Sequence, residues 1–430
     1  MIVDRKKLYQ VFNLGPLEVG QLESLYVDLC DVRGESEPGS VVAYLGDSIR
    51  LSDRHTCQLV TGHQGSGKST EMRRLKKALQ QGDERYFAVI CDIEGELALD
   101  DTDFPDLLLA MVRQLADALH ESFAMELKPG YFATRWNELK GLLGSEVGFE
   151  KAELTVGLAK IVGVLRSSPD SRKPIRDALE PRVDSLLHAA NELFDQAREQ
   201  LKPFGFKDIV LLVDGTDKLK LGTGNDAGTL PGERLFIRRH DQTSGFACHV
   251  CYAIPMALNY SVQNDTLAGL YDQQIPVVPV TKLQDRQAHL IDAAYVKFRE
   301  MIEKRVVFCG STMDGVFADE KVVRELIRLS AGQPRELCIL IRDCLRADLP
   351  IHSATVELVA RRATMAFAQW LEAPHWRMIK EYRSGRQPLQ ESENRDTLRD
   401  LIAGRAILHY RNHEQWLAVN PLVGETPEGI

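Results

Sequence analysis

The sequence predicts an α/β fold with a doubly wound parallel sheet, and two observations support this prediction. Short apolar runs typical of buried strands occur at residues 56–61, 86–93, 208–213, 247–254 and 275–280. Stretches with helical spacing of apolar residues lie between them, and this alternation is typical of a parallel sheet covered on both faces. From residue 281 to about residue 346 the pattern is entirely helical, which predicts a separate helical region.

Composition and charge narrow the protein class. The 430 residues are 44% hydrophobic and 27% charged, which leaves room for two or three domains and excludes a largely disordered chain. No run of 18 apolar residues occurs, and Met1–Gln10 lacks the apolar stretch of a signal peptide. We therefore expect a cytoplasmic protein without a membrane-spanning helix. The net charge of −9 argues against a surface that binds nucleic acid all over, but leaves room for a local basic patch.

Residues 51–280 are predicted to form the sheet domain, after a lead-in segment at 1–50 with turn signals and short helical pieces. Predicted helices follow the first two strands because apolar residues recur there at helical spacing. They cover residues 71–80 and 105–119, and the second begins after an N-cap cluster at 101–103.

A stretch from about 125 to 205 interrupts the alternation. It contains a long amphipathic helix over 175–201, and we interpret it as a helical insertion, either a docking arm or an addition to the core. The segment 222–232 has four glycines and no apolar periodicity, so we expect a mobile loop. Near the end of the chain, helices and a hairpin are predicted, the hairpin formed by residues 406–410 and 416–419.

Cys248 and Cys251 have the Cys-x-x-Cys spacing of a metal or redox site. Both lie in the apolar run 247–254, and no second such pair or paired histidine cluster accompanies them among the eight cysteines and eleven histidines. We interpret them as small buried thiols in a strand.

The strongest functional signal is a complete GxxxxGK[ST] phosphate loop between the first strand and a helix. Its glycines allow the backbone to curl so that N–H groups point at a phosphate, and the helix N-terminus adds positive charge. Lys68 would reach the β- and γ-phosphates, and Ser69 would hold Mg²⁺. The residues predicted to bind the nucleotide are Gly62, His63, Gln64, Gly65, Ser66, Gly67, Lys68, Ser69 and Thr70.

An acidic partner for the magnesium ion is predicted at Asp214, directly after the apolar run 209–213. The carboxyl ends of parallel strands lie beside such a loop, so Asp214 and Ser69 would together form the metal site. Asp217 is a candidate for orienting or deprotonating the attacking water, with a plain surface role as its alternative. Gly215 stands next to Asp214, where many ATPases have a glutamate.

A turn in the helical region presents a candidate phosphate sensor. Gly332, Gln333 and Pro334 precede Arg335, and such a turn would place the arginine in the first turn of a helix. Cations are disfavoured at a helix N-terminus, so an arginine there favours an anion such as a γ-phosphate.

These features, in this order, resemble the AAA+/STAND ATPases and are closest to their origin-recognition-like and signalling branches. The resemblance spans about residues 20–348 and rests on the phosphate loop, the Asp214–Asp217 segment, the strand leading into Ile254-Pro255 and the Gly332–Arg335 turn.

The resemblance implies a switch that binds and hydrolyses ATP with Mg²⁺, with a helical lid over 281–348 and a winged-helix-like domain over 349–430. It also implies site roles outside the phosphate loop. Arg335 would be the lid sensor, Pro334 a neighbour of the adenine, and Tyr26 a contact to the base.

The sequence departs from the family pattern at two places, and the second departure predicts slow hydrolysis. Ile254-Pro255 stands where a polar sensor is usual, and the nearest polar candidate is Asn259. Residues 258–274 contain no arginine, so the usual trans-acting arginine finger, worth roughly 10³ to 10⁵ in rate, has no obvious counterpart. Later arginines that could substitute for it are Arg286, Arg299 and Arg305.

The charge of the last segment favours contact with a protein over DNA binding. Residues 351–430 hold ten Lys and Arg and ten Asp and Glu, so this module lacks the electrostatic footprint of a DNA-binding domain. Arg405 and Arg411 could still form a small patch near the hairpin. The tryptophans of this segment are interpreted as packing residues rather than a base-stacking platform: Trp370, Trp376 and Trp416.

The leading hypothesis is therefore a slowly hydrolysing ATP switch that signals to a protein partner or effector, as in bacterial signalling or anti-phage defence. The alternative is a DNA-associated AAA+ regulator of the loader, origin-binding or transposition-control type. Either class allows a homo-oligomer, and neither calls for a membrane. A degenerate ATPase with a purely structural nucleotide is disfavoured, because Lys68, Ser69 and Asp214 are all present.

Overall fold

The computed structural model describes residues 4–33, 40–128, 179–219, 231–260, 264–271, 274–285, 289–385, 394–411 and 415–425, with isolated positions between 158 and 177. Most of the predicted insertion before residue 179, the glycine-rich segment up to residue 230, and Arg286 lie outside these residues. Among the helices of the described ranges, none combines the length and the apolar character needed to span a membrane.

Four parallel strands form the central sheet, in the order β1-β4-β3-β2. This confirms four of the predicted strands. The fifth, 275–280, contributes a single parallel bridge between Thr61 and Val277 beside β1, and Pro276 and Pro279 explain its shortness because proline has no backbone N–H to donate. The strands are β1 (Cys57–Val60), β2 (Arg85–Asp92), β3 (Phe206–Asp214) and β4 (His249–Ala253).

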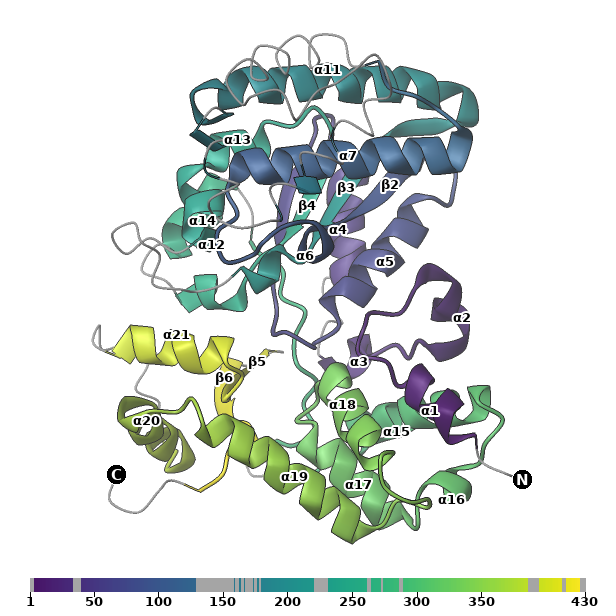
Figure 1. The fold of residues 1–430 in the computed structure, drawn as a ribbon, viewed down its shortest axis with the longest axis vertical. Helices are drawn as coiled ribbons and strands as arrows, with labels where there is room; N and C mark the ends of the chain where they lie inside the picture. Colours follow the sequence, from purple (N-terminus) through teal and green to yellow (C-terminus); the bar gives the residue numbers. More distant parts are fainter. Residues whose placement is uncertain are drawn as a thin grey trace.

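Helices cover both faces of this sheet, which confirms the doubly wound fold (Figure 1). Along β3, Ile209, Leu211 and Val213 point into one core, and Val210 and Leu212 point into the opposite one. A strand buried on both faces has a continuous apolar sequence, and this is why β3 could be predicted. The helices over the first face are α7 (Phe104–Phe123) and α11 (Val183–Leu201), and those over the second are α4 (Val41–Arg50) and α5 (Lys68–Leu79).

The described end of the predicted insertion is an addition to the core rather than an arm. Leu186, Leu193 and Phe194 of α11 are at most 1% exposed and belong to the core that α7 and β3 share. α7 begins where the sequence places its N-cap, at Asp103, whose side chain accepts a hydrogen bond from the Phe104 N–H.

The helical region after the sheet has a hydrophobic core of its own. Leu8 of α1 (Arg5–Val11) and Phe12 are buried in it, whereas α4 packs on the sheet. The lead-in segment is therefore divided between the two cores. The helices of this region are α15 (Asp292–Phe308), α16 (Met313–Val316), α17 (Glu320–Leu329), α18 (Pro334–Cys344) and α19 (Ser353–Ala368).

The last part of the chain forms two helices and an antiparallel hairpin around a small core. Trp376 is buried in this core and Trp370 packs against it, in keeping with the packing role predicted for them. Met256 and Val277 of the sheet domain join the same core, so this module is seated on the sheet domain. Its elements are α20 (Ala373–Arg383), α21 (Arg395–Ala403), β5 (Ile407–Arg411) and β6 (Gln415–Val419).

Shorter helices complete the described fold. They are α2 (Leu22–Leu25), α3 (Cys30–Arg33), α6 (Ile93–Glu96), α12 (Pro231–Glu233), α13 (His240–Ser244) and α14 (Asn264–Leu270), with single turns of other helix types at Val19–Gln21, Glu180–Arg182, Lys202–Phe204, Thr216–Lys218, Arg234–Arg238 and Met256–Tyr260.

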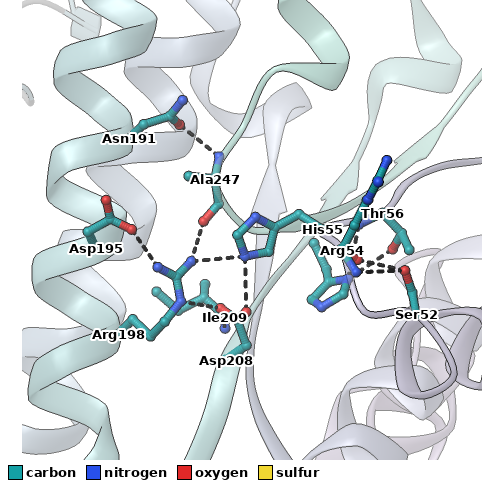
Figure 2. Close-up of polar contacts among 11 residues, drawn as sticks. Ser52, Arg54, His55, Thr56, Asn191, Asp195, Arg198, Asp208, Ile209 and Ala247 are labelled. Carbon is teal, nitrogen blue, oxygen red and sulfur yellow. Dashed lines mark hydrogen bonds and ion pairs between the residues drawn. The ribbon is translucent and has the colours of Figure 1, made fainter.

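Polar side chains connect α11 to the amino-terminal ends of the strands, at the end of the sheet opposite the phosphate loop (Figure 2). Arg198 of α11 pairs with Asp208 (Nε to Oδ1, 2.8 Å), and His55 contacts the other oxygen of that carboxylate at 3.1 Å. Burial raises the pKa of Asp208, but the hydrogen bonds from His55 and Arg198 outweigh it and bring that pKa to about 2. These contacts therefore have a structural role, because they hold α11 against the amino-terminal ends of the strands.

Cys248 and Cys251 lie in and next to β4, where their side chains enter opposite cores. Burial raises the pKa of the Cys251 thiol to about 12. Because the two thiols lie on opposite sides of the sheet, they do not form a common metal or redox site.

Candidate nucleotide-binding site

The predicted phosphate loop connects β1 to α5, and its backbone has the shape that the glycines allow. Gly62, Gly65 and Gly67 all have positive φ angles, of 153°, 86° and 109°. At Gly62 a Cβ would lie 2.5 Å from the carbonyl oxygen of Val278, so any side chain there would clash with the neighbouring backbone. α5 starts at Lys68, which directs its first N–H groups toward the loop.

The Lys68 side chain lies at the centre of the site and is only 3% exposed. Its Nζ donates to the carbonyl oxygens of Gly62 (2.6 Å) and His63 (3.0 Å) and forms an ion pair with Asp217 Oδ2 at 2.8 Å. These contacts use its three donors. The other oxygen of Asp217 is buried and has no hydrogen-bond partner in the part of the chain that the structure describes.

Ser69 and Asp214, the predicted metal ligands, lie beside Lys68 and contact each other. The Ser69 hydroxyl donates to Asp214 Oδ1 at 2.9 Å, and the Gly215 N–H donates to the same oxygen at 2.9 Å. Burial raises the pKa of Asp214, and the nearby Asp217 carboxylate adds to the effect. A bound cation would relieve that repulsion.

This oxygen pair fits Mg²⁺. A magnesium ion bound with a nucleotide needs only one or two protein oxygens, because phosphates and water supply the rest. The described residues contain no group of three or more His, Cys, Asp or Glu side chains that could hold a metal by themselves. Ser69 and Asp214 would therefore hold Mg²⁺ only together with phosphates.

A cavity of about 340 Å³ extends from the phosphate loop between the sheet domain and the helical region. Its volume is in the range of small-molecule sites. The phosphate loop contributes Gly65, Gly67, Lys68, Ser69 and Thr70 to its lining, and Asp217 also borders it. The lining further includes apolar side chains, among them Leu25, Tyr26, Val27, Leu29 and Met301, and the charged Arg33 and Arg305. Polar and apolar lining together suit a ligand with a phosphate chain and a base.

The Gly332–Arg335 turn brings the helical region into contact with the phosphate loop. Pro334 is the first residue of α18 and Arg335 lies in its first turn, as predicted, and both border the cavity. The Arg335 N–H donates to the Gly65 carbonyl at 3.3 Å. Its side-chain Nε is buried without a hydrogen-bond partner among the described residues, so an anion in the cavity would find an available donor.

Tyr26, for which the resemblance implies a contact to the base, also borders this cavity. Its hydroxyl donates to Glu71 Oε1 at 3.3 Å, and the Arg74 guanidinium lies 4.4 Å above its ring. The ring is thus held by α5 and presents apolar surface to the cavity.

His63 lies differently from the other loop residues. Its side chain is 2% exposed and borders a second cavity, of about 470 Å³, next to Trp370 and Gly404 of the C-terminal module. Its Nε2 accepts a hydrogen bond from the backbone N–H of His409 at 2.8 Å. The imidazole of His63 is therefore directed away from the phosphate side of the loop.

Arg33 is a residue at the site that the sequence analysis missed. It is 2% exposed, its guanidinium donates to the Ser66 carbonyl, and it pairs with Glu71 at 3.3 Å. An isolated arginine in a short helix has no diagnostic spacing, so no sequence signal distinguishes it.

The three arginines considered as substitute fingers have different positions. Arg305 is buried and donates to the carbonyls of Leu25 (3.5 Å) and Met301 (3.0 Å) within the same chain, so it is not available to a neighbouring subunit. Arg299 pairs with Glu303 and Glu320. Arg286 lies outside the described residues, and so does the side chain of Asn259.

No family model matches this sequence, and no curated protein matches it. Several solved structures are similar over 96% of the chain. The Walker-type ATPase of Pyrococcus abyssi is 12% identical, with 98% of that chain covered and a TM-score of 0.43. The ORC2 protein of Aeropyrum pernix, in ADPNP–ADP complexes, is 10% identical, with 94% covered and a TM-score of 0.44. The ORC1 protein of Aeropyrum pernix, in complex with DNA, is 11% identical, with 93% covered and a TM-score of 0.39. These similarities are distant, and the site described above rests on the residues of this chain.

Proposed function

We propose that this chain binds ATP with Mg²⁺, hydrolyses it slowly, and acts as an AAA+/STAND-type molecular switch. One observation carries the proposal: the complete phosphate loop, the Ser69–Asp214 pair and Arg335 come from distant parts of the chain and surround the same region. A structural role alone does not require this convergence of a lysine, a hydroxyl, two carboxylates and an arginine.

Each residue then has a definite role. The N–H groups of the loop and the N-terminus of α5 bind the phosphates, Lys68 and Arg335 neutralise the terminal phosphate, and Tyr26 and Pro334 border the base. Mg²⁺ held by Ser69 and Asp214 would supply further charge neutralisation.

Asp217 becomes available for catalysis when Lys68 turns toward a phosphate. In this structure Lys68 pairs with one oxygen of Asp217. Once that pair opens, the carboxylate can accept a proton from an attacking water, which is general base catalysis.

Slow turnover follows from the arginines available. No arginine occurs in residues 258–274, and Arg305 is bonded within its own chain. A missing finger removes a large part of the transition-state stabilisation, which suits a switch better than a motor.

The switch would signal to a protein partner or effector in the bacterial cytoplasm, and anti-phage defence is a setting in which such switches act. The balanced charge of residues 351–430 supports a protein contact over DNA binding at this module. Lid closure on ATP would change the position of the C-terminal module, provided that ATP binds the two arrangements with different affinity.

The test is ATP turnover by the purified chain with and without duplex DNA. Lys68→Ala should abolish turnover, and Lys321→Ala is the matched control because Lys321 is exposed on α17. We expect slow turnover that DNA does not change. Stimulation of tenfold or more by DNA, lost at high salt, would favour the DNA-associated alternative. Turnover no higher than that of Lys68→Ala would contradict hydrolysis.

A further inference from the structure

His63 connects the phosphate loop directly to the C-terminal hairpin. Its Nε2 accepts the backbone N–H of His409 in β5 at 2.8 Å, and both residues are buried, with exposed fractions of 2% and 8%. On its other side β5 pairs with β6. The imidazole therefore takes the position that a further strand would have at the edge of the hairpin.

The main chain of the same residue binds the catalytic lysine. Lys68 Nζ donates to the His63 carbonyl at 3.0 Å and to the Gly62 carbonyl at 2.6 Å. Residue 63 thus contacts Lys68 through its carbonyl and the hairpin through its ring. If Lys68 turns toward a phosphate, it leaves this carbonyl, and the backbone that orients the ring loses its constraint.

The hairpin is also attached to the helical region, close to Arg335. The Tyr410 hydroxyl donates to the Ala331 carbonyl at 3.0 Å, and Arg405, two residues before β5, pairs with Glu336 of α18 at 3.0 Å. The hairpin therefore spans the phosphate loop and the helix that carries Arg335, which are the two parts that the proposed switch moves.

We propose that His63 is a positioning residue that couples nucleotide binding to docking of the C-terminal hairpin, and that ATP releases the hairpin. This inference rests on the proposed function at the same loop. The docked hairpin favours the arrangement in which Lys68 holds the His63 carbonyl, so docking and ATP binding oppose each other. Coupling of this kind is reciprocal: whatever weakens docking must strengthen ATP binding.

Three variants separate the coupling from a simple packing role. His63→Leu removes the acceptor, whereas His63→Gln keeps an acceptor oxygen near the place of Nε2. Tyr410→Phe weakens docking without changing the phosphate loop. One hydrogen bond of this kind corresponds to a change in equilibrium of up to about tenfold.

The measurements are the Kd for ATP by titration calorimetry and hydrogen–deuterium exchange of residues 407–411, with and without ATP. In the wild type we expect ATP to speed this exchange about three- to tenfold, and we expect no ATP effect in Lys68→Ala. His63→Leu should exchange fast in both conditions and bind ATP more tightly. His63→Gln should behave as the wild type, and Tyr410→Phe should also bind ATP more tightly.

The contrary outcomes are distinguishable. Wild-type protein that binds no ATP would overturn the proposed function and this inference with it. Wild-type protein that binds ATP without any change in exchange at 407–411 would overturn the inference alone. Weaker ATP binding by His63→Leu, with Tyr410→Phe unchanged, would mean that His63 only shapes the loop, and would also overturn the coupling.

Discussion

The catalytic role proposed for Asp217 depends on the position of one neighbouring side chain, that of Lys68. Asp217 Oδ2 forms an ion pair with Lys68 at 2.8 Å. The nearby Asp214 accepts a hydrogen bond from the Ser69 hydroxyl, and the charge of Asp217 contributes to the raised pKa of Asp214. A buried carboxylate in such a setting is a candidate general base once its cation has moved.

Asp217→Asn should therefore lower turnover strongly without weakening ATP binding. The amide keeps the size of the side chain but cannot accept a proton, so the rate should fall at least about a hundredfold. Steady-state turnover and calorimetric Kd measure the two effects. Asp83→Asn, at an exposed position, is the matched control, and an Asp217→Asn enzyme with wild-type turnover would refute the assignment.

His249 makes the stability of the protein depend on pH. Its Nδ1 accepts a hydrogen bond from the Thr56 N–H at 3.1 Å. Burial lowers the pKa of His249 to about 4; the negative charge of Asp208 opposes this shift, and the positive charges of His55, Arg198 and Lys207 add to it. In the unfolded chain the pKa is about 6.5. Between pH 6.5 and 4 the unfolded state therefore takes up a proton that the folded state excludes.

Lowering the pH from 7.5 to 5 should thus reduce the free energy of unfolding by about 2 kcal/mol through His249. His249→Asn keeps an acceptor near the position of Nδ1 but does not titrate, so its stability should fall less over the same interval. Urea unfolding at both pH values measures the difference. Equal pH dependence in the two proteins would show that His249 is not the responsible group.

At the scale of elements, the turn before α18 depends on the close approach of the Gly332 backbone to the Thr281 carbonyl group. Gly332 has φ +78°, and a Cβ there would lie 1.7 Å from the Thr281 carbonyl oxygen, which accounts for the glycine. The contact fixes where α18 begins, and so where Arg335 meets Gly65.

Gly332→Ala should destabilise this turn by more than the usual cost of a left-handed alanine, about 1 kcal/mol. Gly310→Ala is the matched control, because Gly310 also has a positive φ (72°) but its added Cβ would meet no atom within 4 Å among the described residues. We expect a loss of about 1 kcal/mol for Gly310→Ala and at least twice that for Gly332→Ala by urea unfolding. Similar losses for both would mean that the backbone at Thr281 yields.

Helices and strands could be predicted from the sequence where a strand is buried on both faces or where a capping residue lies directly at the end of a helix. β3 could be predicted from five consecutive apolar residues, and the start of α7 from its Asp103 cap. The other residues of the segment 275–280 are also apolar, but its two prolines lack the N–H groups that a longer strand needs, and it forms only one bridge. The apolar pattern by itself does not show this loss of hydrogen-bond donors. For the helix predicted over 175–201, periodicity could not distinguish an arm from core, because both present one apolar face.

At the scale of the whole molecule, the site combines local motifs with long-range contacts. The loop and Asp214 follow from local sequence, since a parallel sheet brings strand ends together. The buried Arg33 and the contact between His63 and His409 do not. They depend on how the sheet domain, the helical region and the C-terminal module pack together, and the spacing of these residues in the sequence does not predict that packing.

The divided lead-in segment limits how the lid can move. Phe12 is buried with the helical region and Val41 with the sheet, and the chain crosses back between Val278 and Leu283. Two covalent connections at separate points do not permit free swinging about a single pivot. Any movement of the helical region relative to the sheet must therefore preserve both connections, which reduces the number of ways in which the cavity can close.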